Sequence, residues 1–137
     1  MRFEDWPARL LAVIDGAAAR PFEWGAWDCG AFVGACIEAQ TGANPVAQLA
    51  GRYTTETGMK RILTRDYDGS LRGFWSAQLG APILPTMAGR GDIVVVEVEG
   101  VQASGVVDLS GERVACLGLD GLEFVPIALA VAAWKVS

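Results

Sequence analysis

Hydrophobic positions along this chain change their spacing near residue 80. Before that point, apolar residues recur every three or four positions, which is the period of a helix with one buried face. After it come valine-rich runs separated by short glycine-containing turns, a pattern typical of strands. Because helices and strands are segregated along the chain, the sequence predicts an α+β fold. A helical N-terminal half is expected to pack on a C-terminal antiparallel β-sheet.

The first helix is expected to begin near Asp5, with Pro7 in its first turn, and to end before the loop 21–27. Its predicted buried stripe consists of Leu10, Leu11, Val13 and Ile14. Asp28 is the expected N-cap of a second helix, and Gly42 is its expected end. Asn44-Pro45 then predicts a short helix that closes at Gly51. Two further helices are expected over 56–63 and 71–79.

Strands are expected throughout the second part of the chain. Their predicted ranges are 93–98, 101–109, 113–117, 122–125 and 133–136, with a short helix before the last. The pairs Glu99-Gly100 and Asp120-Gly121 are typical of tight hairpin turns. Consecutive strands joined by such turns are expected to pair antiparallel.

The composition fits one globular domain spanning residues 1–137. The chain is 52% apolar and 20% charged, which is too apolar and too weakly charged for a disordered protein. A domain of this length buries roughly 68% of the surface of its unfolded chain, so it needs no metal or disulfide to hold it together. Three cysteines are an odd number, which excludes a complete disulfide framework and favours reduced thiols.

The charge pattern argues against a nucleic-acid partner. The net charge is −5, whereas phosphate binding needs clustered Lys and Arg side chains. The tightest basic group fits a solvated helix face; it consists of Lys60, Arg61 and Arg65. The longest apolar stretch, 125–134, is roughly half of a membrane span, so no transmembrane segment is expected. Glu4, Asp5 and Asp15 argue against a signal peptide and favour an intracellular start.

The sharpest chemical feature is the segment Trp27-Asp28-Cys29-Gly30, where a loop becomes a helix. A helix N-terminus presents free N–H groups and a partial positive charge, which lower the pKa of a thiol and can bind an oxyanion. The alternative is that Cys29 packs as a small hydrophobic residue, as most free cysteines do. Cys36, two turns later in the same helix, and Cys116, in a predicted strand, are expected in the core.

A loop rich in aromatic residues precedes Cys29. Four aromatic residues are expected around a cleft at Cys29: Phe22, Trp24, Trp27 and Trp6. These rings either close the core over the helix start, because they bury a large apolar area, or form a contact patch for a partner protein. Trp75 and Trp134 are expected in the core or at its rim.

The chain contains no histidine. This removes the commonest zinc ligand, and the three cysteines lack the close spacing of zinc sites. No glycine-rich phosphate or dinucleotide loop is present, because the glycines fall at turns and helix ends. The sequence therefore predicts neither a metal site nor a cofactor.

Several short motifs follow one another in a fixed order: Asp28-Cys29-Gly30 begins a helix, and Gly91-Asp92-Ile93-Val94 opens the sheet after further helices. This order resembles the NlpC/P60 branch of papain-like cysteine peptidases and amidases. The chain is also similar to small phage and prophage proteins with a domain of unknown function in that superfamily (DUF6950-like). That similarity adds Pro21-Phe22-Glu23-Trp24-Gly25, Thr41-Gly42 and Ala133-Trp134-Lys135-Val136. It implies a papain-like fold with Cys29 in the nucleophile position.

The resemblance also identifies what is missing. In active members, a histidine on the strand after the Gly-Asp motif is the base. Aligning the glycine of that strand's motif with Gly105 puts Ala103 at the position of the histidine. The third polar residue of the site then falls near Cys116. Neither Asp28 nor Asp108 replaces the histidine well, because a carboxylate with a pKa of about 4 is a poor base for a thiol with a pKa of about 8.5. The implied degenerate site consists of Cys29, Asp28, Ala103 and Cys116.

Three functions follow from this picture. The first is a structural or assembly protein of a phage, prophage or gene-transfer-agent-like tail tip or baseplate, located in the virion or, before assembly, in the bacterial cytoplasm. Its partners would be other tail proteins. The second is a cell-wall peptidase or amidase in which Cys29 works with a non-histidine or partner-supplied base. The third is a module that binds a peptide or glycan, peptidoglycan included, without cleaving it. The missing histidine favours the first function over the second, whereas the sequence barely separates the first from the third.

Overall fold

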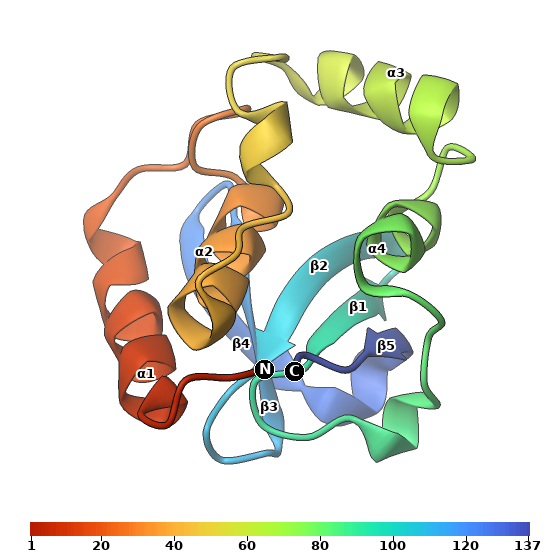
Figure 1. Ribbon diagram of the computed structural model, residues 1–137. Coiled ribbons are helices and arrows are strands. Elements are labelled where there is room, and N and C mark those ends of the chain that lie inside the picture. Colours follow the sequence, from red (N-terminus) through yellow and green to blue (C-terminus); the bar gives the residue numbers. More distant parts are fainter.

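The computed structural model describes all of residues 1–137 and places four α-helices before a five-stranded sheet (Figure 1). The helices are α1 (Trp6–Gly16), α2 (Cys29–Thr41), α3 (Glu56–Asp66) and α4 (Leu71–Leu79). The strands are β1 (Ile93–Val98), β2 (Val101–Val107), β3 (Arg113–Gly118), β4 (Gly121–Pro126) and β5 (Ala130–Trp134). Short 3₁₀ helices connect them: η1 (Ala17–Ala19), η2 (Ala47–Leu49), η3 (Pro85–Met87) and η4 (Ile127–Leu129). The predicted α+β fold, with its helices in the N-terminal part, is confirmed.

The sheet is antiparallel throughout, with the strand order β4-β3-β2-β1-β5. The main core lies between the helices and one face of this sheet, and it includes Phe32 of α2, Trp75 of α4 and Val95 of β1. Alternate strand residues point to the opposite face. There they form a smaller group, the outer cluster, made of Val94, Val96, Val107, Val114, Cys116 and Ala133. Trp75 and Trp134 are both buried, as expected.

Local capping signals fix the ends of the helices that matter most for the site. The side chain of Asp28 accepts a hydrogen bond from the N–H of Ala31, which starts α2. Gly42 ends the same helix in a left-handed conformation, with φ of 85°. Thr55 and Ser70 cap α3 and α4 in the same way as Asp28. The predicted boundaries of α2 are therefore confirmed.

Two helical expectations are wrong in detail. Leu11, predicted to be buried, is 44% exposed, whereas Leu10 and Ile14 are buried one turn apart on the other side of α1. The segment after Asn44 forms only the single turn η2 instead of a longer helix. The Asn44 side chain accepts a hydrogen bond from the N–H of Val46 at 3.0 Å, which favours a turn over helix.

The last strand lies earlier than predicted: β5 covers Ala130–Trp134 instead of 133–136. Trp134 is the final residue to pair with β1, opposite Ile93. Val136 instead donates its N–H to the carboxylate of Asp92, at 3.0 Å. A side-chain acceptor therefore replaces the strand ladder at this position.

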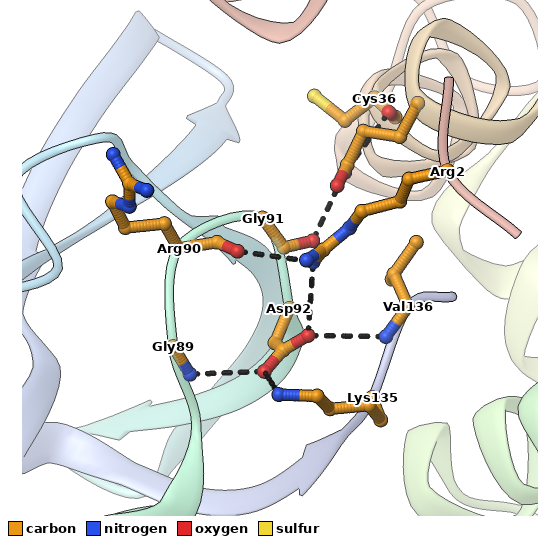
Figure 2. Close-up of polar contacts among 9 residues, drawn as sticks. Arg2, Cys36, Gly89, Arg90, Gly91, Asp92, Lys135 and Val136 are labelled. Atoms are coloured by element: carbon orange, nitrogen blue, oxygen red, sulfur yellow. Dashed lines mark hydrogen bonds and ion pairs between the residues drawn. The ribbon is translucent and has the colours of Figure 1, made fainter. Parts of the chain in front are cut away.

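Asp92 joins the two ends of the chain to the start of β1 (Figure 2). Its fully buried carboxylate accepts hydrogen bonds from the N–H of Gly89 and the N–H of Val136, at 2.9 and 3.0 Å. Arg2 near the N-terminus and Lys135 near the C-terminus form ion pairs with it, at 3.2 and 3.5 Å. In Figure 1 the chain ends accordingly lie together, away from α3.

Strands β2 and β3 pair over only part of their lengths. The ladder consists of Val106 opposite Ala115 and Val107 opposite Val114. Beyond it, β2 continues back to Val101 paired with β1 alone, and β3 continues to Gly118 paired with β4 alone. The sheet is therefore divided by an opening between residues 101–105 and 116–118, which we call the fork.

None of the helices combines the length and the hydropathy that a membrane span requires.

Candidate functional site

Cys29 is the first residue of α2 and lies beside the fork. Its thiol is not in a disulfide, and the residue as a whole is partly exposed to solvent. It lines a groove of about 730 Å³ that also reaches Met59 of α3 and the residues on both sides of the fork. The predicted position of Cys29 at a helix start is confirmed. Its surroundings determine whether the thiol has any nucleophilic character.

Asp28 is held by three hydrogen bonds. One carboxylate oxygen accepts the N–H of Ala31 at 2.9 Å, and the other accepts the N–H of Gly25 at 3.0 Å and the hydroxyl of Tyr53 at 2.5 Å. The residue is 1% exposed. Burial, followed by the hydrogen bond to this carboxylate, raises the pKa of Tyr53. Asp28 thus joins the aromatic loop, α2 and the segment around Tyr53, and its acceptors are occupied by structural partners.

The pKa of Cys29 is raised instead of lowered. Burial of the thiol raises it to about 11, and the negative charge of Asp28 adds to the rise. The N–H groups of Ser104, Gly30 and Cys29 itself act in the opposite direction but do not outweigh burial. At pH 7, about one molecule in 10⁴ then carries the thiolate. The helix N-terminus alone therefore does not activate this sulfur.

A small apolar pocket of about 40 Å³ adjoins the groove at Cys29, which lines both. Its walls include Trp24, Met59, Leu63 and Trp75. The polar side chains in its lining are Asp28, Tyr53 and Ser104. The Ser104 hydroxyl accepts a hydrogen bond from the indole N–H of Trp75 at 2.8 Å. The lining contains no histidine, the side chain that most often serves as a general base.

Two residues of the predicted degenerate site do not face the thiol. Ala103 packs against the outer cluster, and Cys116 belongs to it, so both lie on the sheet face away from the main core. Burial raises the pKa of Cys116 to about 12. Cys36 is buried in the main core, where burial also raises its pKa, as expected for a core cysteine. Ala103 still borders the groove that Cys29 lines, although its side chain does not point to the sulfur.

Ser104 is the site residue that the sequence reasoning missed. It pairs with Val95, a residue of the main core, so its side chain points to the helices. Its N–H is the group on β2 that acts on the Cys29 sulfur. The alternation of strand residues could have identified it, because Ser104 shares a face with the buried Val106.

The aromatic loop divides between two places. Phe22 and Trp24 pack edge to face, with ring centroids 4.9 Å apart, and both line the groove. Trp27 points to the other side of α2, where its indole N–H donates to the carbonyl of Ala17 and Arg20 lies over its ring. The expectation that Trp27 borders the same groove is therefore wrong, because this hydrogen bond holds the ring towards α1.

Two other candidates also lie elsewhere. Trp6 is stacked under Arg2 near the chain ends instead of at the groove. Asp108 directly follows β2 and accepts hydrogen bonds from Ser110 and Arg113. Partial burial opposes its ionisation, but these hydrogen bonds outweigh burial and lower the pKa of Asp108. Its role in the fold is to hold the turn between β2 and β3.

Comparison with known proteins places the chain in a family. Residues 1–136 match the family model described as Domain of unknown function (DUF6950). No curated protein and no solved structure matches the chain. Because the family model covers nearly every residue, this chain belongs to the DUF6950 family.

Proposed function

We propose that this chain is a non-hydrolytic structural or assembly protein of a phage, prophage or gene-transfer-agent-like tail tip or baseplate, built on a degenerate NlpC/P60-type fold. The main support for a non-hydrolytic role is the environment of the Cys29 thiol. Its pKa is raised to about 11, and the pocket around its sulfur contains no histidine to act as the general base. General acid–base steps each contribute about 10²–10⁴-fold to such enzymes, so losing them removes most of the rate.

The tail assignment is supported by the motif order described above, which resembles small phage and prophage proteins. The arrangement of the groove is compatible with it, because a wall with Phe22 and Trp24 provides aromatic contact area for a partner protein. Particles purified from the source phage or induced prophage are expected to contain the chain in a fixed ratio to other tail proteins by quantitative mass spectrometry. Particles that lack it would overturn the tail assignment.

The competing hypothesis is a thiol hydrolase in which Cys29 is activated. The two hypotheses predict different pH dependences for the rate at which iodoacetamide alkylates Cys29. With a pKa of about 11, the rate constant is expected to rise by about tenfold per pH unit from pH 7 to pH 9.5. A Cys29→Ala variant is the matched control, because it retains Cys36 and Cys116 and reports their background reaction. A rate that reaches its plateau below pH 8 would establish an activated thiolate and revive the hydrolase.

A further inference from the structure

The fork exposes main-chain hydrogen-bonding groups inside the sheet. In an antiparallel ladder, alternate residues direct their N–H and C=O groups to the same neighbour. The N–H of Asp108 donates to the carbonyl of Arg113, and Val106 is paired with Ala115. If the ladder continued, Ser104 and Leu117 would be the next two residues to exchange main-chain hydrogen bonds. They are not partners, because the ladder has already ended. The same holds for Gln102, one step farther along β2.

The Cys29 sulfur occupies the closed end of this opening, where it lies near the N–H of Ser104. The main-chain groups of Gln102 and Leu117 that face the fork have no partner strand. Leu117 is only 2% exposed. A buried N–H or C=O group without a partner destabilises the fold, and such groups are rare. The main-chain groups of Gln102 and Leu117 therefore need a ligand whose hydrogen-bond donors and acceptors alternate along its length.

The walls of the groove add an apolar requirement. Residues on both sides of the fork, among them Gln102 and Leu117, share the groove with Phe22 and Trp24. Where the groove reaches Cys29, the adjoining pocket of about 40 Å³ is apolar. This volume holds a small aliphatic group. The polar side chains in its walls already bond to protein partners, so they offer a water molecule little. A ligand that fits both features has a polar backbone with alternating donors and acceptors and a small aliphatic side group.

We propose that the groove binds an extended polypeptide segment of a partner protein as an added strand in the fork. The segment pairs its main chain with Gln102 of β2 and Leu117 of β3 and places an alanine- or valine-sized side chain in the pocket beside Cys29. Strand addition of this kind gains affinity from main-chain hydrogen bonds and specificity from side-chain pockets. The inference rests on the proposed non-hydrolytic role of the same groove. A glycan chain satisfies the polar requirement less well, because its hydroxyl groups do not alternate donor and acceptor at the spacing of a strand.

The test is an amide-resolved NMR titration of the full chain with short capped peptides at millimolar concentration. In these peptides alanine or valine alternates with threonine, lysine or glutamate. We expect saturable shifts at the amides of Gln102, Ser104 and Leu117, with Val106 and Ala115 unchanged. The same peptides N-methylated along the backbone are the matched ligand control and are expected to give no shifts. The proposal is overturned if the capped peptides leave these amides unshifted, or if N-acetylglucosamine oligosaccharides shift them while the peptides do not.

A pair of variants at Gln102 sharpens the test on the protein side. Gln102→Pro removes the N–H of Gln102, which faces the fork, and leaves the β1–β2 ladder intact, because proline is tolerated where a strand N–H has no partner strand. Gln102→Thr retains that N–H. Loss of one main-chain hydrogen bond is expected to weaken peptide binding about fivefold in the proline variant alone. Equal affinities of the two variants would contradict strand addition.

The outcomes separate this inference from the proposed function. Mass spectrometry of the peptides after the titration shows whether they were cleaved. Bound and intact peptides support both proposals. Bound peptides that are cleaved in the wild type but not in Cys29→Ala overturn the non-hydrolytic role and leave strand addition standing. Intact peptides without amide shifts overturn strand addition and leave the non-hydrolytic role standing.

Discussion

Gly105 lies where β2 and β3 begin to separate, and its backbone passes close to β3. A Cβ atom at this position would lie 2.5 Å from a methyl group of Val114, 2.7 Å from the sulfur of Cys116 and 2.8 Å from the carbonyl oxygen of Ala115. The two side chains could move, but the Ala115 carbonyl belongs to the ladder itself. The closed end of the fork therefore depends on a residue without a side chain.

At this residue we predict that Gly105→Ala destabilises the protein by about 1–3 kcal/mol, the usual range for overpacking a core. Urea denaturation followed by tryptophan fluorescence measures the loss. Gly16→Ala is the control, because no atom lies within 4 Å of its added Cβ, and it is expected to be neutral or slightly stabilising. A Gly105→Ala variant as stable as the control would show that the strands relax freely at the fork.

At the scale of the element, the N-terminus of α2 is a junction of three segments. Asp28 caps the helix, receives the N–H of Gly25 from the aromatic loop and receives the hydroxyl of Tyr53. Burial is the main cause of the raised pKa of the neighbouring Cys29 thiol, and the negative charge of the same carboxylate adds to the rise. In this helix start the aspartate therefore supports the fold and opposes thiolate formation at Cys29.

We predict that Asp28→Ala lowers the free energy of unfolding by about 3 kcal/mol, because it removes the cap and leaves two further buried donors without an acceptor. Asp28→Ser retains a capping oxygen but cannot reach Gly25 and Tyr53, so it is expected to recover about 1 kcal/mol of that loss. Chemical denaturation of the three proteins gives both differences. If the serine variant matched the wild type, the contacts to Gly25 and Tyr53 would have no energetic weight.

The same junction shows which features a sequence can predict. The ends of α2 were predictable because capping by Asp28 and termination by Gly42 are local signals. The face of β2 that meets Cys29 was not predicted correctly, because it depends on the register between β1 and β2. Neighbouring residues of a strand point to opposite faces of the sheet, so Ala103 and Ser104 lie on different faces. The fork was not predictable either, since no local signal in the sequence marks the end of the β2–β3 ladder after Val106, where α2 contacts both strands.

At the scale of the whole molecule, the Gly-Asp motif has a structural role that its resemblance to a family signature did not reveal. Asp92 is buried at the start of β1 and contacts residues from both ends of the chain, as Figure 2 shows. Next to it, Gln40 of α2 donates its side-chain N–H to the carbonyl of Gly91 at 3.0 Å. The N-terminal segment, α2, β1 and the C-terminal segment are therefore joined at one place, on the sequence neighbours Gly91 and Asp92.

We predict that Asp92→Asn weakens this whole-molecule connection. The amide keeps the shape of the carboxylate but has one acceptor oxygen for the two N–H groups of Gly89 and Val136, and it has no charge for Arg2 and Lys135. A loss of about 2–4 kcal/mol in the free energy of unfolding follows from a broken buried pair of this kind. Either Gly89 or Val136 then faces the amide NH2 group and loses its acceptor. Amide hydrogen exchange at that residue is expected to accelerate more than exchange within α2, because the α2 amides feel only the lower global stability. Asp120→Asn, an exposed change at the β3–β4 turn, is the control and is expected to leave both measurements unchanged within about 0.5 kcal/mol. If Asp92→Asn lowered the global stability without accelerating exchange selectively at Gly89 or Val136, the ends of the chain would be held by the surrounding packing instead of by this carboxylate.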